Sequence, residues 1–305
     1  MRIRPWLLAA IMLTFCSCIF LMLEWRRRSR DFSDPALLMR LPDKEGSCLY
    51  LNIQALRQAG LLEAIAGQRA DEEAEYRGFV RVSGFDYRDD LDAVMVHFGL
   101  DFELYIARGR FQWEQISRYL KSYGPDVRCS NGVCSIPVSN GRYLSAMPLS
   151  DGVVAIGVGP NRTVVYSAFA LRQHRISQLP AAPFWVELSE DFLKNPRRLP
   201  EGTRAFVSAI NSARHVFISV KPSGGGLEAR LLASFSSTAE AAARRTQLEE
   251  STTLLKKFFE RDNQQPRDSN IASALVSGAF EQKDTEVVGR WPVPSALFQK
   301  VVAGN

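Results

Sequence analysis

Histidine is scarce in this sequence, with three residues among 305. This scarcity limits the acid–base and metal chemistry open to the chain, because imidazole is the side chain most often used for both. The sequence also lacks the G-x-S-x-G, H-E-x-x-H and Walker-type motifs of common hydrolases and nucleotide-binding proteins. Because these features are absent, we predict no catalytic residue, no cofactor-binding residue and no metal ligand.

The chain also lacks a net charge outside residues 1–30. The formal net charge is +5, and residues 1–30 contain six arginines and one glutamate, so the remaining chain carries 32 basic and 32 acidic residues. Nucleic-acid binding needs a basic face that neutralises phosphates. A neutral body therefore excludes DNA or RNA as the expected partner.

Charged residues are entirely absent from residues 6–23, which read WLLAAIMLTFCSCIFLML. As a helix this stretch would be about 27 Å long, close to the hydrocarbon thickness of a bilayer. Tryptophans and arginines at its ends are typical of membrane interfaces. We expect residues 1–30 to form an uncleaved transmembrane anchor, with a cleaved signal peptide as the alternative. The predicted interface residues are Trp6, Trp25, Arg26, Arg27, Arg28 and Arg30.

Cysteine is infrequent, but two of the five cysteines occur in a distinctive segment, CSNGVC. If Asn131-Gly132 forms a two-residue hairpin turn, Cys129 lies opposite Cys134 at a position where side chains approach closely. We therefore predict a disulfide between them, with a pair of small apolar strand residues as the alternative. A disulfide would require an oxidising compartment.

Two patterns conflict over the orientation of the predicted anchor. Four arginines follow residues 6–23 and two precede them, which favours a cytoplasmic body. The predicted disulfide favours the opposite side. Because long domains translocate with limited regard to charge, we expect a single-pass protein of the inner (cytoplasmic) membrane whose body lies outside the cytoplasm.

The remaining chain alternates between strand and helix patterns, which predicts an α+β protein with two antiparallel-sheet modules and packed helices. The order β, α, β, β, α from Cys48 onward predicts a ferredoxin-like (split βαβ) first module. Segment boundaries are set by prolines and by composition. The expected organisation is a juxtamembrane spacer at 31–46, a first module at 47–180, a proline-rich connector at 181–202 and a second module at 203–305.

Three strings together resemble single-pass, membrane-anchored bacterial proteins of unknown function: CLYLNIQALRQAG from Cys48, FDYRDDLDAVMV from Phe85 and IARGRFQWEQI from Ile106. The resemblance covers most of residues 48–160 and extends more weakly over the second module. It implies a fold and a membrane location and carries over no functional residue.

The sequence supports a non-enzymatic, membrane-anchored envelope protein whose body binds a protein or envelope partner. One alternative is a metal-dependent enzyme that uses carboxylates such as Asp86, Asp90 or Glu103. Against it, the acidic string around Asp86 has no EF-hand spacing and is more typical of a turn. Another alternative is a ligand or lipid binder with a cavity between the two modules.

Overall fold

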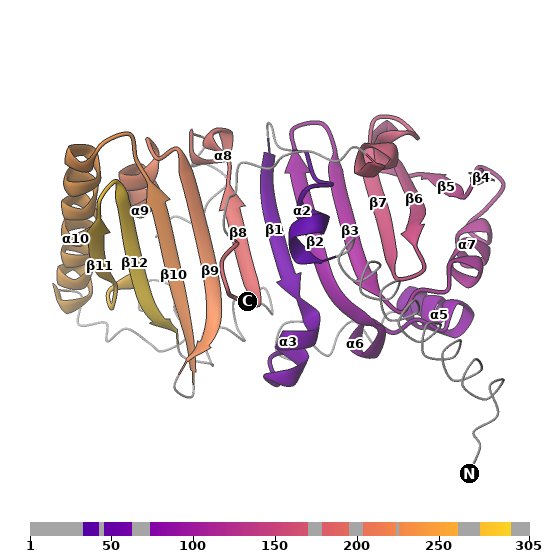
Figure 1. Ribbon diagram of the computed structural model, residues 1–305, viewed down its shortest axis with the longest axis horizontal. Helices are drawn as coiled ribbons and strands as arrows, with labels where there is room; N and C mark the ends of the chain where they lie inside the picture. The colour runs from indigo at the N-terminus through magenta and orange to yellow at the C-terminus, as the bar shows by residue number, and fades with distance from the viewer. Residues whose placement is uncertain are drawn as a thin grey trace, which may run out of the picture.

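Twelve strands in one antiparallel sheet dominate the computed structural model, which describes residues 33–42, 46–62, 74–169, 179–194, 204–223, 226–261 and 275–293 (Figure 1). The strands are β1 (Gly46–Asn52), β2 (Leu91–Gly99), β3 (Glu103–Gly109), β4 (Arg128–Ser130), β5 (Val133–Pro137), β6 (Tyr143–Ser150), β7 (Val153–Gly159), β8 (Phe184–Leu188), β9 (His215–Ser223), β10 (Gly226–Ser234), β11 (Ala279–Lys283) and β12 (Glu286–Val293). Their spatial order is β11-β12-β10-β9-β8-β1-β2-β3-β7-β6-β5-β4.

The prediction of two separate sheets with a ferredoxin-like first module is wrong. Strand β1 pairs with β2 on one side and with β8 on the other, and both pairings are antiparallel. A split βαβ unit needs a parallel pair formed by a helical crossover, whereas β1, β2 and β3 are consecutive antiparallel neighbours here. Strand β8 lies inside the proline-rich segment 181–202 and joins the two sets of strands into one sheet.

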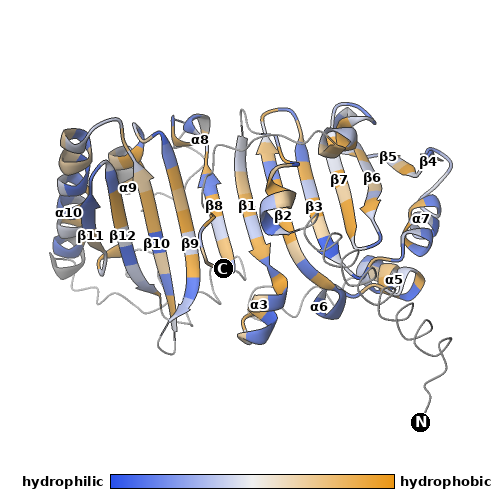
Figure 2. Cartoon of the chain, in the orientation of Figure 1, coloured by the Kyte–Doolittle hydropathy of each residue, from blue (hydrophilic) through white to orange (hydrophobic). Residues whose placement is uncertain are grey.

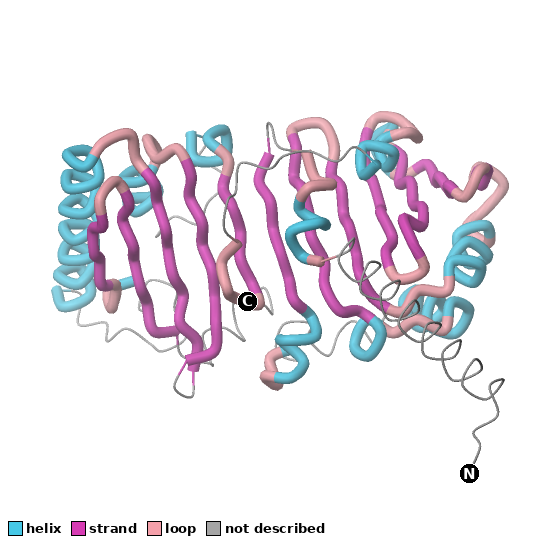
Figure 3. The backbone as a smooth tube through the Cα atoms, viewed as in Figure 1, coloured by secondary structure: helices cyan, strands magenta, loops and turns pink. Residues whose placement is uncertain are grey.

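Most of the helices are short, and one long helix lies along the β11 edge of the sheet (Figure 3). The helices are α2 (Asp34–Leu38), α3 (Ile53–Gln58), α5 (Ala74–Ser83), α6 (Tyr87–Asp90), α7 (Trp113–Lys121), α8 (Glu190–Lys194), α9 (Arg204–Ile210) and α10 (Thr238–Arg261), with 3-10 turns η2 (Ser139–Gly141) and η3 (Val164–Phe169). Helices α10 and α7 contact the edge strands β11 and β4, respectively. Covered edges protect a sheet from pairing with other chains.

The two parts of the sheet bury opposite faces. Register places Tyr50 opposite Met95 and Trp185, and these side chains belong to a core that α2 and η3 cover. In β9, Phe217 packs on that same core, but its neighbour Val216 belongs to a second core under α8, α9 and α10. Successive strand residues point to opposite faces. The apolar face therefore changes sides near β8 and β9. Figure 2 shows that hydrophobic and hydrophilic residues both occur along the strands of the two parts.

His97 is buried, although the alternation of side chains in β2 predicts that it faces solvent. The sequence pattern in β2 suggests that Val94 and Val96 face the core and that His97 faces solvent. In the structure Ala93, Met95 and His97 point toward the α2-covered core, and His97 is 1% exposed. The His97 ring lies against Phe102, with ring centroids 5.5 Å apart, and Val96 on the other face of β2 is also buried, at 4% exposed.

The predicted anchor at 6–23 lies outside the described residues, as do the predicted interface residues Trp6, Trp25, Arg26, Arg27, Arg28 and Arg30. Within the part of the chain that the structure describes, no helix is long and apolar enough to cross a bilayer. Of the described helices α10 is the longest, with 24 residues, and its sequence is mostly polar.

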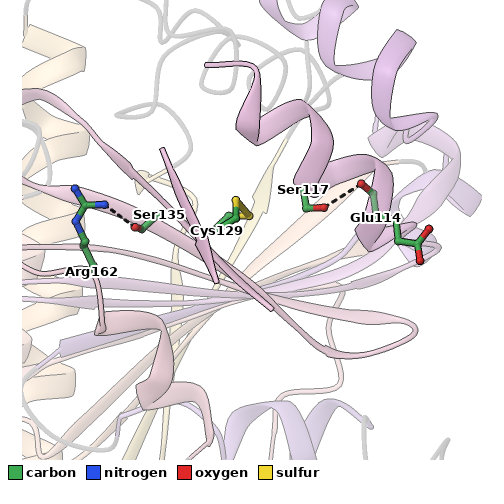
Figure 4. The surroundings of a disulfide bond; sticks show 6 residues. Glu114, Ser117, Cys129, Ser135 and Arg162 are labelled. Carbon is green, nitrogen blue, oxygen red and sulfur yellow. Dashed lines mark hydrogen bonds between the residues drawn. A yellow bond between two sulfur atoms is a disulfide. The ribbon is translucent and has the colours of Figure 1, made fainter. Parts of the chain in front are cut away.

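The disulfide between Cys129 and Cys134 is confirmed (Figure 4). The two residues are direct partners in the β4–β5 hairpin, and Asn131 and Gly132 both have positive φ, as a type I′ turn requires. Helix α7 packs beside this hairpin and contributes Ser117, whose hydroxyl donates to the Glu114 carbonyl oxygen. The bond therefore closes a hairpin at the sheet edge.

Replacing both bonded cysteines with serine is expected to lower the free energy of unfolding by up to about 2 kcal/mol, because the bond restricts a short loop in the unfolded chain. Urea unfolding of the wild type, with and without reductant, and of the double variant measures the effect. Reductant should shift only the wild-type curve. Equal stability of all four samples would contradict a stabilising role for the bond.

Candidate binding site

A pocket of about 270 Å³ lies where α2, the end of β1 and the start of β8 meet. Its position follows from the β1–β8 pairing, which brings residues near position 50 together with residues near position 185. Ligand sites are typically concave and mostly apolar, with a few placed polar groups. The lining consists of Asp34, Tyr50, Asn52, Ala55, Leu179, Pro180, Ala181, Ala182, Pro183 and Trp185.

Two aromatic rings form the buried side of this pocket. Tyr50 and Trp185 are cross-strand partners, and their ring centroids are 5.5 Å apart with an interplanar angle of 28°. Phe217 on β9 contacts the far side of the Trp185 indole edge-to-face, with centroids 6.1 Å apart. Both pocket rings are almost fully buried, so their positions are fixed by the core.

Asp34 forms the charged corner of the pocket. Its Oδ2 accepts a hydrogen bond from the Tyr50 hydroxyl, and its Oδ1 lies 2.9 Å from Nη1 of Arg108. Burial, followed by the hydrogen bond to the Asp34 carboxylate, raises the pKa of the Tyr50 phenol. The carboxylate thus bridges α2 to strands β1 and β3.

The raised pKa of Tyr50 predicts a pH dependence of stability. Unfolded tyrosine ionises near pH 10, whereas the folded phenol stays neutral, so its contribution is complete below pH 10 and is lost as the pH rises toward the folded value. Urea unfolding at several pH values from 8 to 11 should show a shallower alkaline loss for Tyr50→Phe than for wild type. Parallel curves would show that Tyr50 ionises equally in both states.

The loop at 179–183 forms the remaining wall of the pocket, and hydrogen bonds hold it in place. The Pro183 carbonyl accepts a hydrogen bond from the Asn52 amide at 2.7 Å, and the Ala182 amide donates to the Pro180 carbonyl at 2.9 Å. The Asn52 side chain in turn accepts from the Ala55 amide and caps α3. Prolines at 180 and 183 restrict φ, which further stiffens this wall.

A second feature is a set of exposed apolar side chains at one end of the strands, here called the apolar rim. Within the described chain, nine large apolar residues are exposed, and five of them lie at this end. Leu100, at the tip of the β2–β3 hairpin, is 72% exposed, and Phe169 in η3 is 55% exposed. The rim consists of Phe98, Leu100, Val138, Tyr166 and Phe169.

Strand register places these residues at the same end. Phe98 pairs with Glu103 at the start of β3, and Glu103 pairs with Val158 near the end of β7. Gly159, the next residue of β7, pairs with Tyr143 on β6, and Tyr143 also pairs with Pro137 on β5. Val138 directly follows β5, and η3 begins five residues after β7 ends and packs against Gly157 and Gly159, so all rim residues lie at the same end of the sheet.

Two arginines stand at this end of the sheet in fixed positions. Arg142 forms an ion pair with Glu103 and donates to the Val158 carbonyl at 2.9 Å. The guanidinium of Arg162 lies 4.5 Å from the Tyr143 ring centroid and donates to the Ser135 hydroxyl at 3.0 Å (Figure 4). Exposed aromatic side chains close to ordered arginines are typical of protein interfaces.

The three carboxylates weighed for a metal site are not brought together in one place, although the Asp86 amide donates to Asp90 Oδ2 at 2.9 Å. Asp86 accepts hydrogen bonds from the Tyr76 hydroxyl and the Arg88 amide and caps α6, and Asp90 pairs with Arg110. Glu103 lies at the opposite end of β3, near Arg142. Across the described residues, no group of three or more histidine, cysteine or acidic side chains is arranged to hold a metal ion.

Sequence reasoning missed the polar corner of the pocket. Ser33-Asp34-Pro35 indicates a helix start, and α2 does begin there, but Asp34 reaches Tyr50 and Arg108 instead of capping the helix. Tyr50 and Trp185 are separated by more than 130 residues in the chain. A local pattern cannot signal such a pair, because only sheet pairing brings them together.

Comparisons with known proteins relate this chain to solved structures only. No family model and no curated protein matches it. Crystal form I of TP0453 has 8% sequence identity with this chain and a TM-score of 0.51. The alignment covers 88% of this chain and 96% of the TP0453 chain. Crystal form III of TP0453 is 7% identical and has a TM-score of 0.48, with coverage of 88% and 98%. The first of these similarities describes the fold alone.

Proposed function

We propose that this chain is a non-enzymatic binding protein of the bacterial envelope that binds a protein partner through the apolar rim. Residues 6–23 hold it in the inner membrane, and its folded body lies outside the cytoplasm. The observation that carries the proposal is the collection of exposed apolar residues at one end of the sheet. Exposed apolar side chains that gather in one region mark interaction sites, whereas scattered ones need no explanation.

The disulfide supports the proposed compartment. Bonds of this kind persist in oxidising surroundings such as the periplasm and are rare in the cytosol. The neutral body beyond residue 30 also supports a protein partner in preference to an anionic surface.

The rim composition favours a protein over a lipid bilayer as the occupant. Aromatic residues and arginine are enriched at protein interfaces. A bilayer surface would instead favour uncompensated basic groups, but Arg142 is already paired with Glu103 and Asp101 is exposed beside Leu100. Binding of lipid at the rim is therefore an outcome that the experiment must distinguish.

Photo-crosslinking from Leu100 in the full chain, expressed in its native membrane, tests the proposal. A crosslinking amino acid at Leu100 should give one discrete protein adduct. The same substitution at Leu254 on α10 is a matched control, because Leu254 is 67% exposed and Leu100 is 72% exposed. We expect no such adduct from Leu254.

Adding Phe169→Asp to the Leu100 crosslinking chain should reduce the adduct at least about tenfold, because a charge in an apolar contact must be desolvated. Circular dichroism should show that the variant remains folded. Equal adducts from the two leucines, adducts to lipid alone, or insensitivity to Phe169→Asp would overturn the proposal.

A further inference from the structure

We infer that the pocket between α2, β1 and β8 binds a small organic cation, an ammonium group carried on a compact apolar body. This inference goes beyond the proposed function, since the pocket lies away from the apolar rim. Its elements are a carboxylate, two aromatic rings and a rigid apolar wall, all on described residues.

The charge on the pocket wall favours a cation. Asp34 is the single charged residue in the lining, and Arg108 contacts its other carboxylate oxygen without lining the pocket. The ion pair is therefore oriented with its negative end toward the cavity. An anionic ligand would meet that negative end, whereas an ammonium group could donate to the carboxylate and the Tyr50 oxygen.

The aromatic rings hold the carboxylate corner of the pocket in place. Tyr50 and Trp185 stack on each other, with ring centroids 5.5 Å apart, and they are 3% and 1% exposed, so almost none of either ring surface is open to the cavity. The packed Tyr50 ring fixes the position of its hydroxyl, which donates to Asp34 Oδ2. The charged group of a ligand would therefore meet a preorganised carboxylate.

The walls restrict the size of the ligand. A volume of about 270 Å³ is near the lower end of the range for small-molecule sites. The Asn52–Pro183 hydrogen bond and the two prolines hold the loop at 179–183 in place, so the cavity has little freedom to expand. A compact amine with one ring fits these limits better than a peptide or a lipid.

Three probes of nearly equal shape test the charge preference: phenethylamine, phenylethanol and phenylacetate. Titration of each into the full-length protein, followed by ligand-observed NMR, should give binding of phenethylamine at least about tenfold tighter than binding of phenylethanol, with no detectable binding of phenylacetate. Equal binding of the amine and the alcohol, tighter binding of the acid, or no binding of the amine would overturn the inference.

Two variants locate the binding. Asp34→Asn keeps the shape of the side chain but removes its charge, so the preference for the amine over the alcohol should disappear. Ala182→Phe should fill the cavity and abolish binding of the amine. Asp101→Asn, in the exposed β2–β3 turn, is the control and should leave the affinity unchanged. An unchanged amine affinity in Ala182→Phe would place the binding elsewhere.

These results are independent of the crosslinking result at Leu100. The probes act on the isolated protein and need no partner. The three-probe comparison on the wild type remains decisive even if a pocket variant fails to fold.

Discussion

Trp185→Ala is expected to lower the free energy of unfolding by about 4 kcal/mol, the largest effect of any single substitution proposed for this chain. The indole is 1% exposed and contacts Tyr50 on β1 and Phe217 on β9. It therefore packs across three adjacent strands at the point where the two parts of the sheet meet. Removing it leaves a cavity that the surrounding rigid strands cannot close.

Denaturant unfolding measures this loss, and Trp113→Ala on α7 is the matched control. Trp113 is half-buried at the start of a helix, so its removal should cost less than half as much. Near-UV circular dichroism of both variants reports whether the fold persists. Equal losses for the two tryptophans would show that β8 does not join the two parts of the sheet through Trp185.

The local hairpins of this fold could be predicted from the sequence because their registers are set by short turns. Asn131-Gly132 fixes the pairing of Cys129 with Cys134, and the short turn after Gly99 fixes β2 against β3. The segment 239–260 follows a cap-like Ser236-Ser237-Thr238 and predicts a long helix, and α10 (Thr238–Arg261) matches that range to within a residue at either end. In each case the interacting residues are near one another in the chain.

The pairing of β1 with β8 could not be predicted in the same way. Cys48 lies opposite Glu187 across 138 intervening residues, and no turn chemistry connects them. The apolar run at 205–210 is typical of a strand, but it forms most of α9 (Arg204–Ile210), because a short apolar run suits a buried helix equally well. Tertiary packing against β9, β10 and α10 decides between the two.

The change of buried face explains why the prediction of two sheet modules misassigned the fold. Each set of strands has its own core and its own helices, as separate modules would. The hydrogen bonds of β8 with β1 and β9 nevertheless run without a break. A pattern read from side chains detects two cores, whereas the single sheet is a property of the backbone pairing.

Gly109→Ala is expected to lower the free energy of unfolding by about 3 kcal/mol, because β3 passes too close to the chain before β2 for a side chain to fit. A Cβ at position 109 would overlap the Asp90 carbonyl oxygen and lie 3.1 Å from the Leu91 Cα. Neither backbone can withdraw freely. The Gly109 amide donates to the Gly152 carbonyl at 2.9 Å, and the Arg110 amide donates to the Asp90 carbonyl at 2.8 Å.

Gly78→Ala provides a control in which the same substitution has the opposite sign. Gly78 lies within α5, and a Cβ there would meet no atom within 4 Å. Alanine should therefore raise the free energy of unfolding by up to about 1 kcal/mol through its better helix propensity. Urea unfolding of both variants measures the two effects. A Gly109→Ala protein as stable as the wild type would show that β3 does not approach the Asp90 backbone this closely.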